Sequence, residues 1–152
     1  MGLVGLQTAI NLKEKHPEAK VNVIDRQSWG LGASTRNAGF GCFANVSEIL
    51  DDIKYDTPEN VYLNISKRYQ GLVKLRKKFG DKNIDYQTKG SIEIFTQKNK
   101  HELSKAIDSL QGINNLLSDE LCIDRVFTFK NNSSLPHVCL LYTSDAADEV
   151  VS

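Results

Sequence analysis

The chain has 152 residues, and its 19 Lys plus Arg balance its 19 Asp plus Glu, so the formal net charge at pH 7 is zero. This balance gives no support for a nucleic-acid partner or for binding to an acidic membrane surface. The hydrophobic content of 40% and the charged content of 25% are ordinary for a globular chain, and the length suggests about one domain.

The first predicted element is a helix over residues 2–15 that opens on two glycines. Gly2 and Gly5 have the spacing of the second and third glycines of the dinucleotide motif G-x-G-x-x-G, whose first glycine would precede Met1. Gly2 would let the backbone approach a pyrophosphate, and Gly5 would let the helix pack closely on a sheet. The helix start would direct free N–H groups and its positive dipole end at the phosphates. The pair alone is also typical of plain helix packing.

A short apolar strand is predicted over residues 21–25, and it ends in Asp25. An acid about twenty residues beyond the glycines is placed to accept hydrogen bonds from a ribose diol. It would also repel a ribose 2′-phosphate, although the neighbouring Arg26 weakens that inference. Glycine pair, helix, strand and terminal acid in this order predict a nucleotide-binding unit that lacks its first strand.

The chain then enters a long loop, where a protein that binds NAD alone would usually continue into another helix and strand. The loop is rich in Gly, Ser, Thr, Arg and Asn. Glycines allow close backbone approach, hydroxyls and amides donate to phosphate or ring oxygens, and Arg36 offers a fork for phosphate. The same residue types are common in ordinary turns.

Three stretches resemble the flavin cradle of the D-amino-acid-oxidase-like FAD-dependent oxidoreductases, a group that includes glycine, sarcosine and γ-glutamylputrescine oxidases. They are residues 2–5, 23–26 and 32–40, and the similarity continues through residues 47–52 and 85–87. The third stretch is the most discriminating, because the first two are common to many FAD proteins. The first strand and first glycine of the family are missing.

The resemblance implies noncovalent FAD, with the glycine pair at the pyrophosphate and Asp25, next to Arg26, on the adenosine ribose. The loop would follow the phosphates, the ribityl chain and then the flavin ring. The candidate cofactor-binding residues are Gly2, Gly5, Asp25, Arg26, Ser34, Thr35, Arg36, Asn37, Ala38 and Gly39. The implied reaction is oxidation of the C–N bond of an amine or amino acid by hydride transfer to FAD. No catalytic residue is assigned.

Beyond residue 46 the pattern changes to amphipathic helices and short strands. Helices are expected over residues 47–54, from a Thr57-Pro58 start to Gly80, and from residue 99 to about 117. Strands are expected over 84–87, 91–96 and 123–130. The predicted fold class is therefore α/β: an incomplete FAD-binding Rossmann-like domain over residues 1–46, then a helical segment and the start of an α+β substrate domain over 47–138.

Residues 139–152 break both the pattern and the resemblance. Their first ten residues are similar to a translated reading frame of a commonly used transposase sequencing adapter, and the alternative is an ordinary terminus. Without residues 139–152, which hold three acids and no base, the balance is 19 basic against 16 acidic residues. We expect a gene fragment truncated at both ends.

The cysteines, the histidines and the hydropathy of the chain bear on its redox compartment and on metal and membrane binding. Cys42, Cys122 and Cys139 are a scattered, odd set that fits a reducing compartment, and no histidine has a partner at metal-ligand spacing. No apolar run approaches the length of a membrane span, and no signal peptide is visible. We therefore expect a cytoplasmic protein without a metal or a membrane span, whose oligomeric state is unknown.

Two other functions are compatible with the same residues. The first is a non-catalytic remnant with little or no cofactor binding, because the strand over 21–25 would be left unpaired. The second is a fragment of an NAD-binding oxidoreductase, which the loop over residues 34–39 disfavours.

Overall fold

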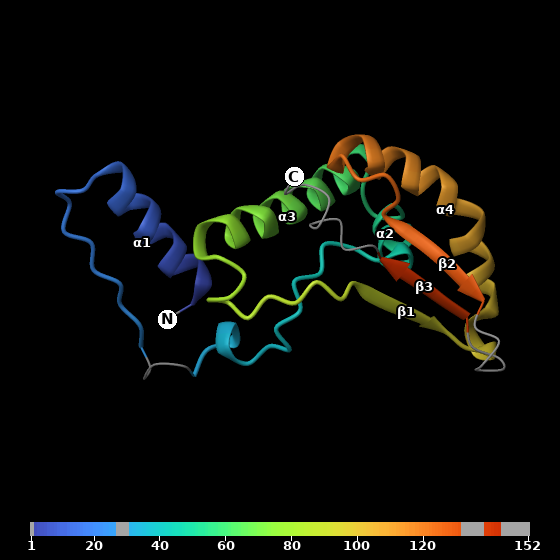
Figure 1. Ribbon diagram of the computed structural model, residues 1–152, viewed down its shortest axis with the longest axis horizontal. Coiled ribbons are helices and arrows are strands. Elements are labelled where there is room, and N and C mark those ends of the chain that lie inside the picture. The colour runs from blue at the N-terminus through green and yellow to red at the C-terminus, as the bar shows by residue number, and fades with distance from the viewer. Residues whose placement is uncertain (1, 27–30, 132–138, 144–152) are drawn as a thin grey trace. The chain divides into compact units, whose positions relative to one another are not determined.

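The computed structural model describes residues 2–26, 31–131 and 139–143 (Figure 1). The chain divides into two compact units, Met1–Gly41 and Cys42–Ser152, which we call the N-terminal and C-terminal units. The division falls shortly before the domain boundary predicted after residue 46.

In the N-terminal unit the predicted helix is confirmed as α1, Leu3–Lys15. Its start follows an extended Gly2 (φ −97°, ψ 160°), and its end is closed by Lys13, whose ammonium group donates to the carbonyls of Pro17 and Ala19. None of the residues of α1 is buried. The helix is therefore formed by local hydrogen bonds and has no core of its own.

The predicted strand over residues 21–25 is not formed. These residues carry no strand hydrogen bonding, and none of their apolar side chains is buried: Val21 is half-buried, and Val23 and Ile24 are 38% and 90% exposed. A strand exists through its hydrogen bonds to a neighbour, and the described part of this unit contains no second strand. The prediction of a buried strand here is therefore wrong, because the described residues of this unit hold no strand with which residues 21–25 could pair.

In the C-terminal unit, α2 (Val46–Asp52) and α3 (Pro58–Phe79) begin at well-formed caps. The side chain of Asn45 accepts a hydrogen bond from the N–H of Glu48 at 2.8 Å, and Thr57 caps α3 by accepting from Asn60 at 3.3 Å. These contacts satisfy N–H groups that have no partner inside a helix. Both predicted helices are confirmed, and α3 ends where expected, at Gly80 with φ 77°.

The last helix, α4 (Lys100–Leu121), is longer than predicted. It runs through Gly112 and ends at Cys122, which takes the left-handed conformation with φ 57°. Glycine is unfavourable inside a helix by about 1 kcal/mol relative to alanine. The burial of Ala106, Ile113 and Leu117 on the same helix outweighs that penalty.

Three short strands form one antiparallel sheet in the order β1-β3-β2 (Figure 1). They are β1 (Ser91–Phe95), β2 (Phe127–Asn131) and β3 (Cys139–Thr143), and a short 3-10 helix, η2 (Gln97–Asn99), follows β1. The central strand β3 thus comes from the segment that the sequence assigned to an adapter-derived tail. Residues 144–152 of that predicted tail lie outside the described residues.

The strand predictions meet mixed outcomes in the structure. The one over 91–96 is confirmed as β1, and the one over 123–130 begins later, at Phe127. The one over 84–87 is wrong, because residues 81–85 form turns in which Asp85 has φ 49°. The N–H of Tyr86 donates back to the carbonyl of Asp81 at 2.9 Å, which is incompatible with an extended strand.

The strand β1 turns its apolar alternation outward. Ile92 and Ile94 are 50% and 60% exposed, whereas Phe95 is buried. Glu93 lies on the covered face, where its carboxylate accepts a hydrogen bond from the N–H of Ser47 at 3.4 Å. This contact at the start of α2 gives the charged side chain a partner, so the inward position of Glu93 is tolerated.

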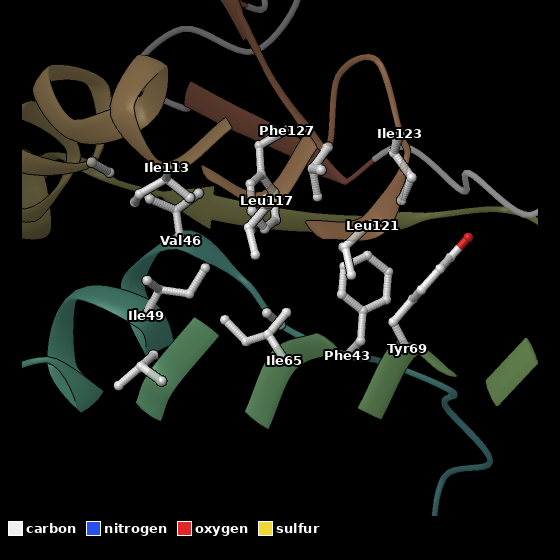
Figure 2. Packing of buried hydrophobic residues seen from close by; sticks show 14 of the residues in the cluster. Phe43, Val46, Ile49, Ile65, Tyr69, Ile113, Leu117, Leu121, Ile123 and Phe127 are labelled. Atoms are coloured by element: carbon white, nitrogen blue, oxygen red, sulfur yellow. The ribbon is translucent and has the colours of Figure 1, made fainter. Parts of the chain in front are cut away.

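The core of the C-terminal unit lies between α2, α3, α4 and one face of the sheet (Figure 2). Its largest fully buried side chains are Val46, Ile49, Ile65, Leu117, Val126 and Phe127. The rings of Phe43 and Tyr69 meet edge to face with centroids 5.4 Å apart. Burying each large apolar side chain contributes about 1.5–3 kcal/mol, so this cluster holds the unit together.

Candidate functional site

The start of α1 and the loop that follows residue 31 meet in the N-terminal unit. The N–H of Leu3, at the first turn of the helix, donates to the Ser34 hydroxyl oxygen at 3.1 Å. A β-carbon added to Gly2 would lie 3.5 Å from the same oxygen. The structure therefore brings together two of the predicted cofactor-binding residues, Gly2 and Ser34, which lie far apart in the chain.

Packing against the described residues does not require glycine at either position of the predicted motif. A β-carbon at Gly5 would lie 4.0 Å from Val23, an ordinary van der Waals contact. The contact at Gly2 is ordinary too, and both backbones have room for alanine. A reason for glycine at Gly2 that is compatible with these contacts is the close approach of a ligand to the backbone.

The loop from Gly32 to Gly39 is shaped by its own hydrogen bonds. A single 3-10 turn, η1 (Ala33–Thr35), opens with the hydroxyl of Thr35 donating to the carbonyl of Gly32 at 2.9 Å. The Asn37 amide donates to the carbonyl of Ser34 at 2.8 Å and accepts from the N–H of Gly39 at 2.7 Å. Gly39 has φ 74°, a conformation that side chains disfavour. Asn37 and Gly39 thus set the course of the loop.

The charged residues of the predicted site stand in solvent. Asp25, Arg26 and Arg36 are all exposed, as is Ala38. Exposed charges are accessible to a ligand from solvent. The described geometry therefore joins the helix start to Ser34 and leaves the ribose-binding role of Asp25 as a prediction.

A polar corner at the end of α3 escaped the sequence prediction. Arg76 donates to both carboxylate oxygens of Asp81, at 2.9 and 2.6 Å, and its guanidinium lies 4.2 Å from the centre of the Tyr86 ring. The hydrogen bond from Arg76 lowers the pKa of Asp81. The available sequence signal was the position of Asp81 directly after Gly80, the glycine that ends the helix. The contact of Arg76 with Tyr86 depends on the turn over residues 81–85, which the predicted strand over 84–87 excluded.

A cleft of about 760 Å³ lies between α2 and α4 in the C-terminal unit. Its walls carry charges of both signs, including Asp51, Lys54, Glu102 and Lys105. Lys54 donates to Asp51 at 2.6 Å, and that hydrogen bond raises the pKa of Lys54. Both side chains are more than 60% exposed, so the pair is a solvated surface contact of small energetic weight.

Within residues 2–26, 31–131 and 139–143, no three His, Cys, Asp or Glu side chains come together in a way that could hold a metal ion. The same described residues include no helix with the length and hydrophobicity needed to cross a bilayer.

Comparison with known proteins does not identify a family for this chain. No family model, no curated protein and no solved structure matches the chain. The functional argument therefore depends on the residues and contacts described above.

Proposed function

We propose that this chain is part of an FAD-dependent oxidoreductase that oxidises the C–N bond of an amine or amino acid, and that its first forty residues form part of the FAD site. The observation that carries the proposal is the hydrogen bond from the N–H of Leu3 to the Ser34 hydroxyl at 3.1 Å, across 31 residues of chain. It joins the glycine-led helix start to the Ser-Thr-Arg-Asn loop. A shared cofactor requires this proximity, and an unrelated surface turn does not.

The groups at this junction suit a diphosphate. The first turn of α1 directs backbone N–H groups and a positive dipole end outward, Gly2 presents no side chain, and Ser34 adds a hydroxyl. FAD, when bound, would supply the hydride acceptor. In this proposal the residues of the chain bind and orient it: the junction holds the diphosphate, Asp25 the ribose, and Arg36 a phosphate.

A second candidate, a remnant with little or no affinity for FAD, is favoured by a different observation. The described residues of the N-terminal unit include no buried side chain, and Leu3, Val4 and Ile24 are 63%, 82% and 90% exposed. Ordering a backbone residue costs about 1–2 kcal/mol, and burial of apolar surface is the main term that offsets it. Without that burial, the FAD site would be held in place weakly.

Titration of the full chain with FAD, followed by flavin fluorescence and absorbance, tests these proposals. We expect saturable FAD binding that Ser34→Ala weakens, because the variant loses the hydroxyl at the helix start. Ser104→Ala is the matched control, since Ser104 is exposed on α4 in the other unit.

The possible results of this titration separate the hypotheses. FAD binding weakened by Ser34→Ala and unchanged by Ser104→Ala supports the proposal. Binding of NAD without FAD would establish the NAD-binding alternative. Failure to bind either nucleotide, with the C-terminal unit folded, would establish the remnant.

A further inference from the structure

The strand β2 lies at an edge of the sheet, and one side chain is bonded to the backbone of that edge. Among the described strands, β2 pairs with β3 alone. The amide of Asn114, on α4, donates to the carbonyl of Phe127 at 2.9 Å and accepts from the N–H of the same residue at 2.8 Å. A side chain therefore makes the pair of hydrogen bonds that a neighbouring strand would make.

The direction of these bonds follows from the geometry of an antiparallel strand. The N–H and C=O of one residue point to the same side of the strand, and the side alternates from residue to residue. Because both groups of Phe127 are bonded to Asn114, they point away from β3, those of Thr128 point toward it, and those of Phe129 point outward again. Asn114 thus occupies the first outward position of the edge, and Phe129 is the next.

The rest of this edge is suited to accept another strand. A groove of about 540 Å³ runs between α4 and β2, and its lining combines apolar side chains such as Leu110 and Phe129 with polar and charged ones such as Gln111, Asp124 and Arg125. The β2 sequence Phe-Thr-Phe favours extended structure. An edge with this composition pairs readily with strands of other chains, and proteins use local devices to prevent that pairing.

We propose that Asn114 guards the edge of β2 that no described strand covers against strand addition by a second copy of this chain. Antiparallel pairing of two β2 strands about Phe129 would place Phe127 of one copy opposite Asn131 of the other. The hydrogen-bonding groups of Phe127 are already bonded to Asn114, so this register would have to break two hydrogen bonds before forming its own. Asn114 therefore acts by bonding to the backbone of Phe127 at one end of the edge, and it does not bond to the backbone of Phe129.

The unmodified chain provides the first test, by residue-resolved hydrogen exchange at low protein concentration. We expect the N–H of Phe127 to exchange slowly and the N–H of Phe129 to exchange freely, although both point outward from the same strand. Equal protection of the two groups would overturn the proposal, because the edge would then be covered without Asn114.

The second test compares Asn114→Ala with two matched variants across a range of protein concentration. Asn115→Ala removes a neighbouring amide that lines the same groove, and Ile113→Val shortens a buried side chain on the same helix while leaving the Asn114 amide in place. We expect Asn114→Ala alone to gain concentration-dependent protection of the Phe129 N–H, by about tenfold or more in exchange rate. Sedimentation velocity should show a dimer of this variant under the same conditions.

The outcomes of the second test are distinct. Protection of Phe129 in Asn114→Ala but in neither control supports the guard. Equal self-association in Ile113→Val would overturn it, because general loss of stability would then explain the effect. If Asn114→Ala fails to fold, Asn114→Asp replaces it: the carboxylate still accepts from Phe127 but cannot donate, and we expect a smaller gain in protection. Absence of any gain in the folded variant would also overturn the proposal.

Discussion

The two units of this chain differ in whether their regular secondary structure is accompanied by a buried core. The C-terminal unit surrounds one cluster of buried side chains with three helices and a sheet, and every buried hydrophobic residue among those described lies in it. The N-terminal unit has a regular helix and a hydrogen-bonded loop, yet it buries none of its described side chains. The comparison shows that good helix signals and a well-formed loop do not by themselves produce a core.

The largest expected effect comes from deleting a core leucine and comparing it with its exposed counterpart. Leu117 is fully buried on α4, whereas Leu12 on α1 is 43% exposed. We expect Leu117→Ala to lower the free energy of unfolding of the C-terminal unit by about 2–5 kcal/mol, and Leu12→Ala to change it by less than about 0.5 kcal/mol. Urea unfolding followed by circular dichroism measures both. Similar losses in the two variants would contradict the distinction between the units.

A helix cap in the stable unit should have a smaller but measurable effect. Thr57→Ala removes the oxygen that accepts from the N–H of Asn60 and is expected to reduce stability by about 1 kcal/mol. Thr57→Asp keeps an acceptor at the same position and is the control. Chemical unfolding of the two variants checks this, and equal losses would show that the capping hydrogen bond contributes nothing.

The smallest expected effect is a change in acid sensitivity at the end of α3. The hydrogen bond from Arg76 holds the pKa of Asp81 below its ordinary value of 3.8, so the charged carboxylate stabilises the folded state. That contribution is present above the unfolded-state pKa and is lost as the pH falls through the lower, folded-state pKa.

We therefore expect Asp81→Asn to flatten the loss of stability below about pH 4. Urea midpoints measured as a function of pH report this change. Asp85→Asn is the control, because Asp85 lies in the same turn with φ 49°, a conformation that asparagine also accepts. An unchanged pH profile in Asp81→Asn would contradict the assigned role of Asp81.

The helices of this fold were predictable because their signals are local. A capping threonine followed by proline fixed the start of α3, and Gly80 fixed its end. The strands at 21–25 and 84–87 failed for the opposite reason, since a strand depends on a partner elsewhere in the chain. At residues 84–87, the contacts of Arg76 with Asp81 and Tyr86 favour a turn. The pattern of apolar residues in the sequence does not indicate these contacts.

The candidate site was predictable in its parts and not in its assembly. The resemblance implied that Gly2 and Ser34 lie along one cofactor, and the structure places Ser34 beside the start of the helix that Gly2 precedes. Asp25 and Arg36 have exposed side chains, whose orientation neither spacing nor resemblance predicts. The Asn114 contact with Phe127 was invisible in the sequence, because it joins a helix to a strand edge.

The inward orientation of Glu93 has a consequence for how β1 is aligned. By hydrophobicity alone, Ile92 and Ile94 should face the helices, and a shift of the strand by one residue would achieve that. The hydrogen bond between the Ser47 N–H and Glu93 opposes the shift, and so does the burial of Phe95. Both contacts therefore favour the observed alignment of β1 over one that would bury the two isoleucines.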